Sequence, residues 1–268
     1  MARTGGGNSK RWPALARGLD RLNRLVQLAE GLPSLRAYLL LLTGLLMLVN
    51  LYLILFVAPM DVISGQQDVQ RIIYFHVPLA MISFVAFFVV FLASGIYVFK
   101  RQSRWDSLAN ASAEVGVVFI SLALITGIIW GKSAWGAWWL WTPRLTTTLI
   151  LWLIYVAYLM IRAYAPSRSK AAIFGAAMGI MGFADVLVVY FSVQWWPGIH
   201  PTPVVGPLAE SDSLNTTMRS VLLFSFLTFL FLLTYLVMER MALRDTEDRI
   251  RGIRFALRRA RVDLLSRE

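Results

Sequence analysis

The sequence predicts an all-α, polytopic membrane protein with six transmembrane helices and both termini in the cytoplasm. Of its 268 residues, 58% are hydrophobic and only 15% are charged, whereas a soluble domain has about 45–50% apolar and about 25% charged residues. Six apolar stretches approach or exceed the roughly 17–25 residues that a helix needs to cross a bilayer. None of them alternates as a barrel strand does, and a helix pairs its own backbone groups within lipid.

The six predicted spans follow one another without a domain-scale repeat. They are residues 37–60, 72–99, 115–131, 145–161, 171–196 and 220–238. Of these, only the fifth contains a charged residue, Asp185. An acid within lipid is costly and often functional, but the simpler expectation is that Asp185 accepts hydrogen bonds from Ser, Thr or Tyr in the bundle.

The distribution of positive charge predicts the orientation. If both ends of the chain lie on one side, that side holds 22 of the 26 Lys and Arg residues. The opposite side keeps only Arg71, Lys132, Arg144 and Arg219. Because Lys and Arg are retained on the cytoplasmic side of membrane proteins, both ends are predicted to be cytoplasmic. Topology thereby explains the net charge of +11, and no nucleic-acid partner is predicted.

Two basic segments, 1–36 and 239–268, are predicted to flank a single membrane domain over residues 37–238. Each places apolar residues at helical spacing among arginines: Leu15, Leu19, Leu22, Val26 and Ala29 in the first, and Ile250, Ile253, Leu257 and Leu264 in the second. Basic amphipathic helices of this kind rest on membrane lipid, and the docking of a partner protein is the alternative. Because the first apolar run begins at residue 37, no cleavable signal peptide is predicted.

The chain has two histidines, His76 and His200, and no cysteine. The lack of thiols excludes disulfides, thiolate metal sites and thioether attachment of haem. Pro78 suits the first turn of a helix, which predicts that His76 stands at the outer end of the second span. Prolines surround His200 and predict an ordered loop just beyond the fifth span. Both histidines are therefore expected on the outer side.

Seven of the ten tryptophans are predicted on that same outer side. They are Trp130, Trp135, Trp138, Trp139, Trp141, Trp195 and Trp196. Tryptophan is enriched at both membrane interfaces, so an aromatic belt is one interpretation, although a belt should be two-sided. The other interpretation is an apolar platform for a flat ligand, with Trp135, Trp138 and Trp139 on one face if their segment is helical.

Two imidazoles beside an aromatic platform favour an iron porphyrin as the ligand. Neutral imidazole is a good iron ligand, and the lack of cysteine and of an acidic cluster on the outer side disfavours zinc or calcium. Arg144 or Arg71 would then face the haem propionates. The spacing of these residues alone does not decide between a haem site and a purely structural role of the two histidines.

Three motifs carry a resemblance to a known family. They are WGAWWLWTPRLT at residues 135–146, FHVPLA at 75–80, and SVQWW at 192–196 with His200 four residues later. The first resembles the tryptophan-rich WWD signature of the haem-handling proteins of cytochrome c maturation. With six spans and cytoplasmic ends, the chain resembles the CcmC or haem exporter protein C family of the bacterial system I pathway over about residues 37–240.

The resemblance implies a haem-delivery protein of the bacterial cytoplasmic (inner) membrane with its site on the periplasmic side. It implies that haem is presented to the chaperone CcmE, within a complex containing the ABC-type subunits CcmA and CcmB and the small protein CcmD. Position by position, it makes His76 and His200 the axial iron ligands. It assigns these further residues to haem binding: Trp135, Gly136, Trp138, Trp139, Trp141, Arg144, Trp195 and Trp196.

One position departs from the family pattern. The aspartate that follows the last tryptophan of the signature is Thr142 in this chain. A threonine supplies no negative charge, so any contact that needs this charge is in doubt. The predicted ligands and the apolar cradle are unaffected.

Two other functions stay open. A transmembrane haem b electron carrier needs ligand pairs within its spans, usually at two depths, and this chain has one pair predicted outside. A solute or ion transporter needs polar residues along a path, for which Asp185 alone is slight support. No nucleophile, acid–base pair or activated water is recognisable, so the protein is predicted not to be an enzyme.

Overall fold

The predicted all-α fold is confirmed by the computed structural model, which describes residues 35–59, 68–200 and 214–265. The described elements are the helices α2 (Leu35–Tyr52), α3 (Ile73–Lys100), α4 (Ser103–Trp135), α5 (Pro143–Tyr164), α6 (Arg168–Trp195) and α7 (Thr216–Leu265), with a π-helical turn at Leu53–Val57 and a 3₁₀ turn at Asp68–Ile72. Within these residues there is no strand, and six helices are long and apolar enough to cross a membrane. The apolar pattern predicted at residues 15–29 lies outside the described residues.

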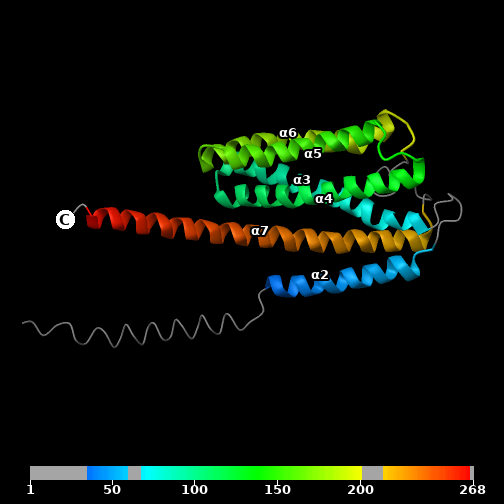
Figure 1. Ribbon diagram of the computed structural model, residues 1–268, viewed down its shortest axis with the longest axis horizontal. Coiled ribbons are helices and arrows are strands. Elements are labelled where there is room, and N and C mark those ends of the chain that lie inside the picture. The colour runs from blue at the N-terminus through cyan, green and yellow to red at the C-terminus, as the bar shows by residue number, and fades with distance from the viewer. Residues whose placement is uncertain (1–34, 60–67, 201–213, 266–268) are drawn as a thin grey trace, which may run out of the picture.

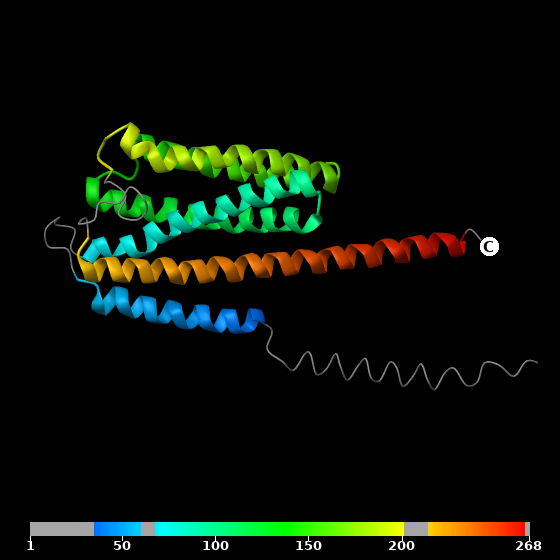
Figure 2. The same ribbon diagram turned by 180° about the vertical axis from the view of Figure 1, so that it is seen from behind.

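The helices run side by side along one axis (Figures 1 and 2). Helix α3 is central, because it packs against α4, α6 and α7, while α5 packs against α6 and α4. Helix α2 lies at the edge of the bundle and packs against α7. The four helices α3 to α6 therefore form a compact unit, to which α7 and then α2 are added on one side.

Small residues allow the central helices to approach closely. A Cβ added to Gly116 of α4 would lie 2.7 Å from Phe87 of α3, and one added to Gly179 of α6 would lie 2.7 Å from the Ser94 hydroxyl of α3. The same Phe87 ring stacks on Tyr155 of α5 with ring centroids 3.6 Å apart. Packing of this kind holds helices together in lipid, where the hydrophobic effect does not drive their association.

The two ends of the bundle differ in character. We call the end that carries His76 the site end, and the opposite end, where α7 projects, the tail end (Figure 1). At the site end α3, α5 and α7 begin and α4 and α6 finish. The helix dipoles of α3, α5 and α7 therefore direct their positive ends toward the site end.

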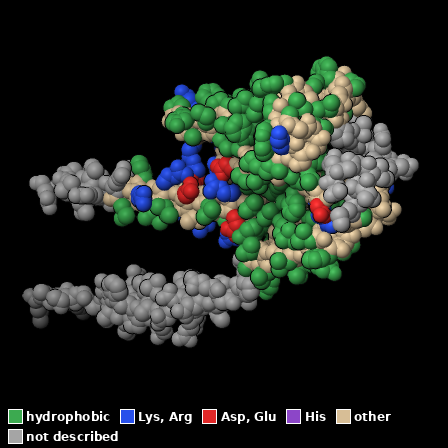
Figure 3. Space-filling model, turned by 45° about the vertical axis from the view of Figure 1, so that its right-hand side comes forward, with side chains coloured by type: hydrophobic (Ala, Val, Ile, Leu, Met, Phe, Trp, Pro, Cys, Tyr) green, Lys and Arg blue, Asp and Glu red, His purple; other side chains and the backbone are tan. Residues whose placement is uncertain are grey.

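Helix α7 continues without a break through the boundary predicted at residue 239. Its 50 residues make it roughly 75 Å long at about 1.5 Å per residue, against roughly 30 Å of hydrocarbon. Beyond the bundle core, Glu114 of α4 pairs with Arg240 and Arg244 of α7, and Arg168 of α6 pairs with Asp248 of α7. Figure 3 shows Lys, Arg, Asp and Glu side chains gathered where α7 leaves the apolar bundle. The segment predicted at residues 239–268 is therefore continuous with the last apolar helix as far as Leu265.

Two local expectations differ from the structure. Pro78 is the sixth residue of α3 rather than part of its first turn, because the 3₁₀ turn leads directly into the helix at Ile73. Its missing N–H leaves the carbonyl of Tyr74 without the usual i→i−4 bond. The second difference concerns Asp185, whose Oδ2 is buried and has no hydrogen-bond partner among the described residues.

Candidate functional site

His76 lies in the first turns of α3 and is fixed by the facing helix α4. Its Nδ1 is 3.0 Å from the carbonyl oxygen of Ala123 and 3.2 Å from the hydroxyl oxygen of Thr126. A carbonyl can only accept, so Nδ1 carries the ring proton and Nε2 carries the lone pair. The Thr126 hydroxyl donates to the Leu122 carbonyl at 2.8 Å, which leaves its oxygen free to accept as well. Hydrogen bonds of this kind orient a metal-binding histidine.

Gly127 provides the surface on which the His76 ring rests. A Cβ added there would lie 2.8 Å from Cε1 of the imidazole, a distance that real side chains do not tolerate. Trp130, one turn further along α4, meets the same ring edge-on with centroids 5.6 Å apart. Four residues on one face of α4, namely Ala123, Thr126, Gly127 and Trp130, thus define the position of the His76 ring.

His200 approaches from the connection that follows α6. Helix α6 ends at Trp195, and residues 196–200 form a series of bends. The imidazole of His200 lies beside the ring of Trp135, with centroids 5.8 Å apart. Trp135 is the last residue of α4, and Gly136 ends that helix with a left-handed φ of 75°. The predicted position of His200 just beyond the fifth span therefore agrees with the described backbone.

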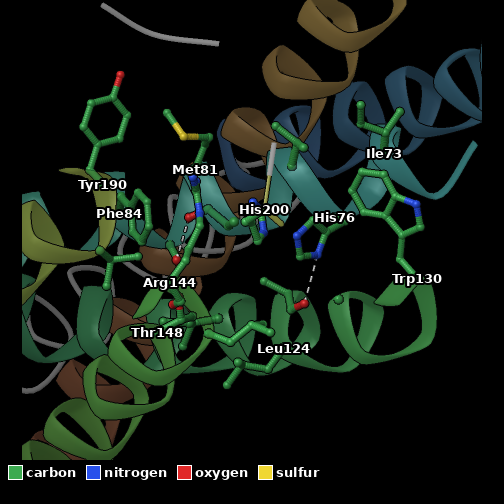
Figure 4. A pocket seen from close by; sticks show the side chains of 18 residues that line it. Ile73, His76, Met81, Phe84, Leu124, Trp130, Arg144, Thr148, Tyr190 and His200 are labelled. Carbon is green, nitrogen blue, oxygen red and sulfur yellow. Dashed lines mark hydrogen bonds between the residues drawn. The ribbon is translucent and has the colours of Figure 1, made fainter. Parts of the chain in front are cut away.

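Two adjoining cavities bring the histidines together. Both cavities are lined by His76, His200, Gly127, Trp130 and Leu145. One of them continues between α3, α4, α5 and α6 toward Arg144 and Tyr190, and the other toward Trp135. Figure 4 shows the two imidazoles with Trp130 and Arg144 around the first cavity. The lining is otherwise mostly apolar, which suits a flat hydrophobic ligand.

Arg144 supplies a buried cationic group at the wall of the first cavity. It is the second residue of α5, and its Nη1 is buried without a hydrogen-bond partner among the described residues. A buried charged donor without a partner is costly, which points to an acceptor that the described chain does not provide. The alternative cation, Arg71, instead donates to the carbonyls of Ile54 and Leu55 and pairs with Asp68.

The other predicted tryptophans do not line the two cavities. Trp138, Trp141, Trp195 and Trp196 are between 52% and 75% exposed. Trp139 packs edge-on against Trp141. Since α4 ends at Trp135, the residues that follow do not continue its helical face, and the condition for aligning Trp135 with Trp138 and Trp139 is not met. Trp138 and Trp141 on the α4–α5 connection, with Trp195 and Trp196 at the end of α6, are exposed at the site end, and we call these four residues the exposed aromatic rim.

Thr142, at which the chain departs from the resembled signature, is the N-cap residue of α5. Its hydroxyl accepts a hydrogen bond from the backbone N–H of Leu145 at 3.4 Å, and Pro143 occupies the first helical position. Aspartate and threonine both act as N-caps. Thr142 therefore keeps a capping contact that an aspartate could make, without its charge.

Sequence reasoning missed the α4 residues that hold His76. Ala123, Thr126 and Gly127, followed by Trp130, recur at the i, i+3, i+4 and i+7 spacing of a single helical face. That spacing was visible in the sequence, but nothing in it indicated that this face meets His76. The contact depends on how α3 and α4 pack together.

Comparison with known proteins identifies the family. The family model described as Heme exporter protein C matches residues 20–254 of the chain, which include both histidines and the tryptophan-rich connection. The chain belongs to the Heme exporter protein C family. It is a multi-pass membrane protein, with six apolar helices among its described residues.

Individual members of the Heme exporter protein C family are similar over the membrane domain. The protein of that name from Escherichia coli K12 is 33% identical over 184 residues, which cover 69% of this chain and 73% of the relative. Its namesake from Bradyrhizobium diazoefficiens is 32% identical over 183 residues, or 68% and 69% of the two chains. The namesake from Paracoccus denitrificans is 31% identical over 192 residues, or 70% and 78%.

Proposed function

We propose that this protein binds haem at the site end through His76 and His200 and delivers it to the haem chaperone CcmE in cytochrome c maturation. The coarser part of this role, haem delivery in cytochrome c maturation, agrees with membership of the Heme exporter protein C family. The finer part of the proposal names the two iron ligands, the side of the membrane on which haem is bound and the protein that receives it.

One observation carries the proposal: the only two histidines of the chain line the same pair of cavities. Within the described residues no three His, Cys, Asp or Glu side chains form a group that could hold a metal ion. Two imidazoles make a poor site for a free ion, but a porphyrin brings four nitrogens of its own. Two axial imidazoles then complete the six-coordination of its iron.

The residues present fit haem in charge as well as in ligand type. Nη1 of Arg144, which finds no hydrogen-bond partner among the residues that the structure describes, would pair with a propionate. Guanidinium–carboxylate bonds are among the stronger hydrogen bonds in proteins. The apolar lining and the rings of Trp130 and Trp135 would shield the macrocycle. The exposed tryptophan rim, with Gly136 between Trp135 and Trp138, would lie where a partner protein can reach the bound haem.

In this proposal the residues of the chain bind haem and release it again, and none of them catalyses a reaction on a substrate. The Ala123 carbonyl and the Thr126 hydroxyl keep the proton on Nδ1 of His76, so that Nε2 can bind iron. Bound haem would supply the iron that the two imidazoles ligate. The proposed function is therefore that of a transport protein and not of an enzyme.

We place the site end on the periplasmic side of the bacterial inner membrane. The support is the charge distribution, because 22 of the 26 Lys and Arg residues belong to the two terminal segments and the tail-end connections. In this orientation the rim faces CcmE, and the projecting part of α7 lies in the cytoplasm with the ABC-type subunit CcmA. CcmB and the small protein CcmD would contact the bundle within the membrane.

The function is tested by haem transfer. The full chain is co-expressed with CcmA, CcmB, CcmD and CcmE in a host without its own haem exporter protein C, and the haem on purified CcmE is measured. The proposal predicts a normal load with the unaltered chain and at least about a tenfold smaller load with His76→Ala or His200→Ala. Tyr164→Ala, an exposed aromatic at the tail end, is the control and should change nothing.

A normal chaperone load with both histidines replaced would contradict the proposal. The rival functions give other results in the same preparations. Rapid reduction of the bound haem by quinol would indicate an electron carrier, and movement of a solute across vesicles without haem would indicate a transporter.

A further inference from the structure

At the tail end, α7 attaches to the bundle by one side only. Arg240, Arg244 and Asp248 pair with charged residues of α4 and α6. These three positions of α7 are four residues apart, so they lie near one another on the side that faces the bundle. Beyond Asp248 the helix continues to Leu265, and Figure 2 shows it extending past the ends of the other helices.

Four large aliphatic residues of α7 share another side, and we call them the seam. They are Leu243, Ile250, Ile253 and Leu257, and each is between 45% and 65% exposed. Their spacing of seven, three and four residues is that of the a and d positions of a heptad, along which two helices pack in a coiled coil. At roughly 100° per residue, all four lie at least roughly 100° around the helix from Arg244.

A seam of this kind indicates a partner helix. Single exposed apolar residues are common on protein surfaces, but here they follow the heptad spacing on a helix that has left its bundle. An isolated helix is only marginally stable in water, and most helical stability in proteins comes from packing of an apolar face. An amphipathic helix laid against another apolar surface is a recurring mode of protein recognition.

The charges beside the seam indicate the chemistry of that partner. From Arg249 to Leu257 the chain has three arginines and no acid. Arg249 precedes Ile250 and Arg254 follows Ile253, so both arginines occupy the g and e positions that determine pairing in coiled coils. Neither arginine forms an ion pair with another described residue. Acidic residues at the flanking positions of a facing helix would complement them.

The same charges disfavour a second copy of this chain. Two copies in one membrane present their α7 helices in parallel, and Arg249 of one would then face Arg254 of the other. Residues 15–29 of this chain are also disfavoured, because they carry three arginines and one aspartate among their apolar residues. Membrane lipid is disfavoured by the direction of α7, which continues without a break from a membrane-spanning stretch and so leads away from the bilayer.

We infer that the seam docks an amphipathic helix of a partner protein, whose own apolar residues are flanked by Asp or Glu. The seam belongs to the tail end, whereas His76 lies at the site end (Figure 1). The inference therefore goes beyond haem binding and does not depend on it.

Site-specific photo-crosslinking identifies what covers the seam. The full chain, with p-benzoylphenylalanine in place of Ile253, is expressed together with CcmA, CcmB, CcmD and CcmE and irradiated in intact cells, and the crosslinked peptide is identified by mass spectrometry. The inference predicts a peptide from another protein, in a helix with Asp or Glu beside its apolar residues. Combining Arg249→Glu with Arg254→Glu should lower the yield at least about tenfold, because like charges then face each other.

Phe255 provides the matched control position. It is 70% exposed on the same helix, but it lies two residues and therefore roughly 200° around the helix from Ile253. The photoreactive residue placed there should give little crosslinking to the same protein. A crosslink from position 253 to a second copy, to residues 1–36 or to lipid overturns the inference, and so does the absence of any crosslinked protein.

A second measurement does not depend on which proteins the cell supplies. Its probe is a synthetic heptad peptide with Leu at a and d and Glu at e and g, titrated onto the full-length protein in nanodiscs of neutral lipid. Ile250→Ser combined with Ile253→Ser should weaken binding at least about tenfold through the loss of apolar contact area, and Phe255→Ser should leave it unchanged. Equal loss with Phe255→Ser, or equal binding of a peptide with Lys in place of Glu, overturns the inference.

The failure of the proposed function looks different. The variant with Arg249→Glu and Arg254→Glu should bind haem as the wild type does, because neither arginine lines the cavities of His76 and His200. Wild-type protein that docks the acidic helix but takes up no haem refutes the haem site alone. Normal haem binding without docking refutes only the seam.

Discussion

Gly127 of α4 and His76 of α3 are in direct contact, and a single methyl group on the glycine would lie 2.8 Å from the imidazole. Gly127→Ala should therefore push the ring from its position and weaken haem binding by at least about tenfold, or about 1.4 kcal/mol. The measurement is a haem titration of the purified full-length protein, followed by absorption spectroscopy.

Gly95→Ala is the matched control for this substitution, because Gly95 also lies in a membrane helix but has open space around its Cα. It should leave haem affinity unchanged and stabilise α3 by about 0.5–1 kcal/mol. Equal haem affinity in the Gly127→Ala and wild-type proteins would show that His76 does not depend on this contact.

Arg144 should act through the propionates of the haem. Arg144→Gln is expected to weaken haem binding by about 1.5–3 kcal/mol, the range for hydrogen bonds to charged groups. Haem dimethyl ester, which lacks the propionate charges, separates this effect from a general disturbance. The ester should bind wild type more weakly than haem does and should bind both proteins equally, so a full Arg144→Gln loss with the ester would refute the pairing.

The same substitution has an opposite effect on the empty protein. Since Nη1 of Arg144 is buried and has no hydrogen-bond partner in the part of the chain that the structure describes, its removal should relieve an unfavourable burial. Haem-free Arg144→Gln should therefore unfold in detergent at the same temperature as wild type or at a higher one. A large decrease would mean that Arg144 is a structural residue.

Thr142 should matter as a helix cap rather than through charge. Thr142→Ala removes the acceptor for the Leu145 N–H and should cost about 0.5–2 kcal/mol in thermal unfolding. Thr142→Asp, which restores the aspartate of the resembled signature, should keep the cap and add about 0.3–1 kcal/mol through the helix dipole. If Thr142→Asp also raises haem transfer severalfold, the charge has a function beyond capping.

The ion pairs at the tail end should hold the projecting part of α7 against the bundle. Glu114 accepts hydrogen bonds from Arg240, Arg244 and Asn110. Its side chain and the two arginines are partly exposed, whereas Asn110 is buried. Glu114→Gln is expected to cost about 1 kcal/mol after allowance for solvent screening, which would speed limited proteolysis beyond residue 239 about fivefold. Glu247→Gln is the control, because its contact with Arg251 is long, at 3.9 Å, and exposed; equal rates in the two variants would refute the tether.

The sequence was sufficient for the fold class and for the end of the bundle at which the histidines lie. The lengths of the apolar stretches alone predicted six spans. The numbers of Lys and Arg residues in the connections assigned these connections to two sides of the membrane. The lengths of the helices were less predictable, because α4 begins at Ser103 and α7 continues to Leu265. In these extensions Asp106 of α4 pairs with Arg162 of α5, and Arg240 of α7 pairs with Glu114 of α4. A hydropathy profile does not detect ion pairs between helices.

That His76 and His200 lie at one site could be expected from the sequence, whereas the residues that hold His76 could not. His76 and His200 were conspicuous as the only imidazoles, and Arg144 as one of few outer cations. The contribution of Gly127 depends on the packing of α3 against α4, a tertiary contact that no local pattern encodes. The tryptophans suggested a platform, but the end of α4 at Gly136 separates Trp135 from the exposed rim.

The most direct test of the central claim is the electronic state of haem bound to the purified full-length protein. Absorption and electron paramagnetic resonance spectra of the ferric form should show six-coordinate, low-spin iron with two imidazole ligands. His76→Ala and His200→Ala should each lose that signature, by becoming high-spin or by losing haem. A low-spin bis-imidazole spectrum that persists in either single variant would contradict the account, because the chain has no third histidine to replace the lost ligand.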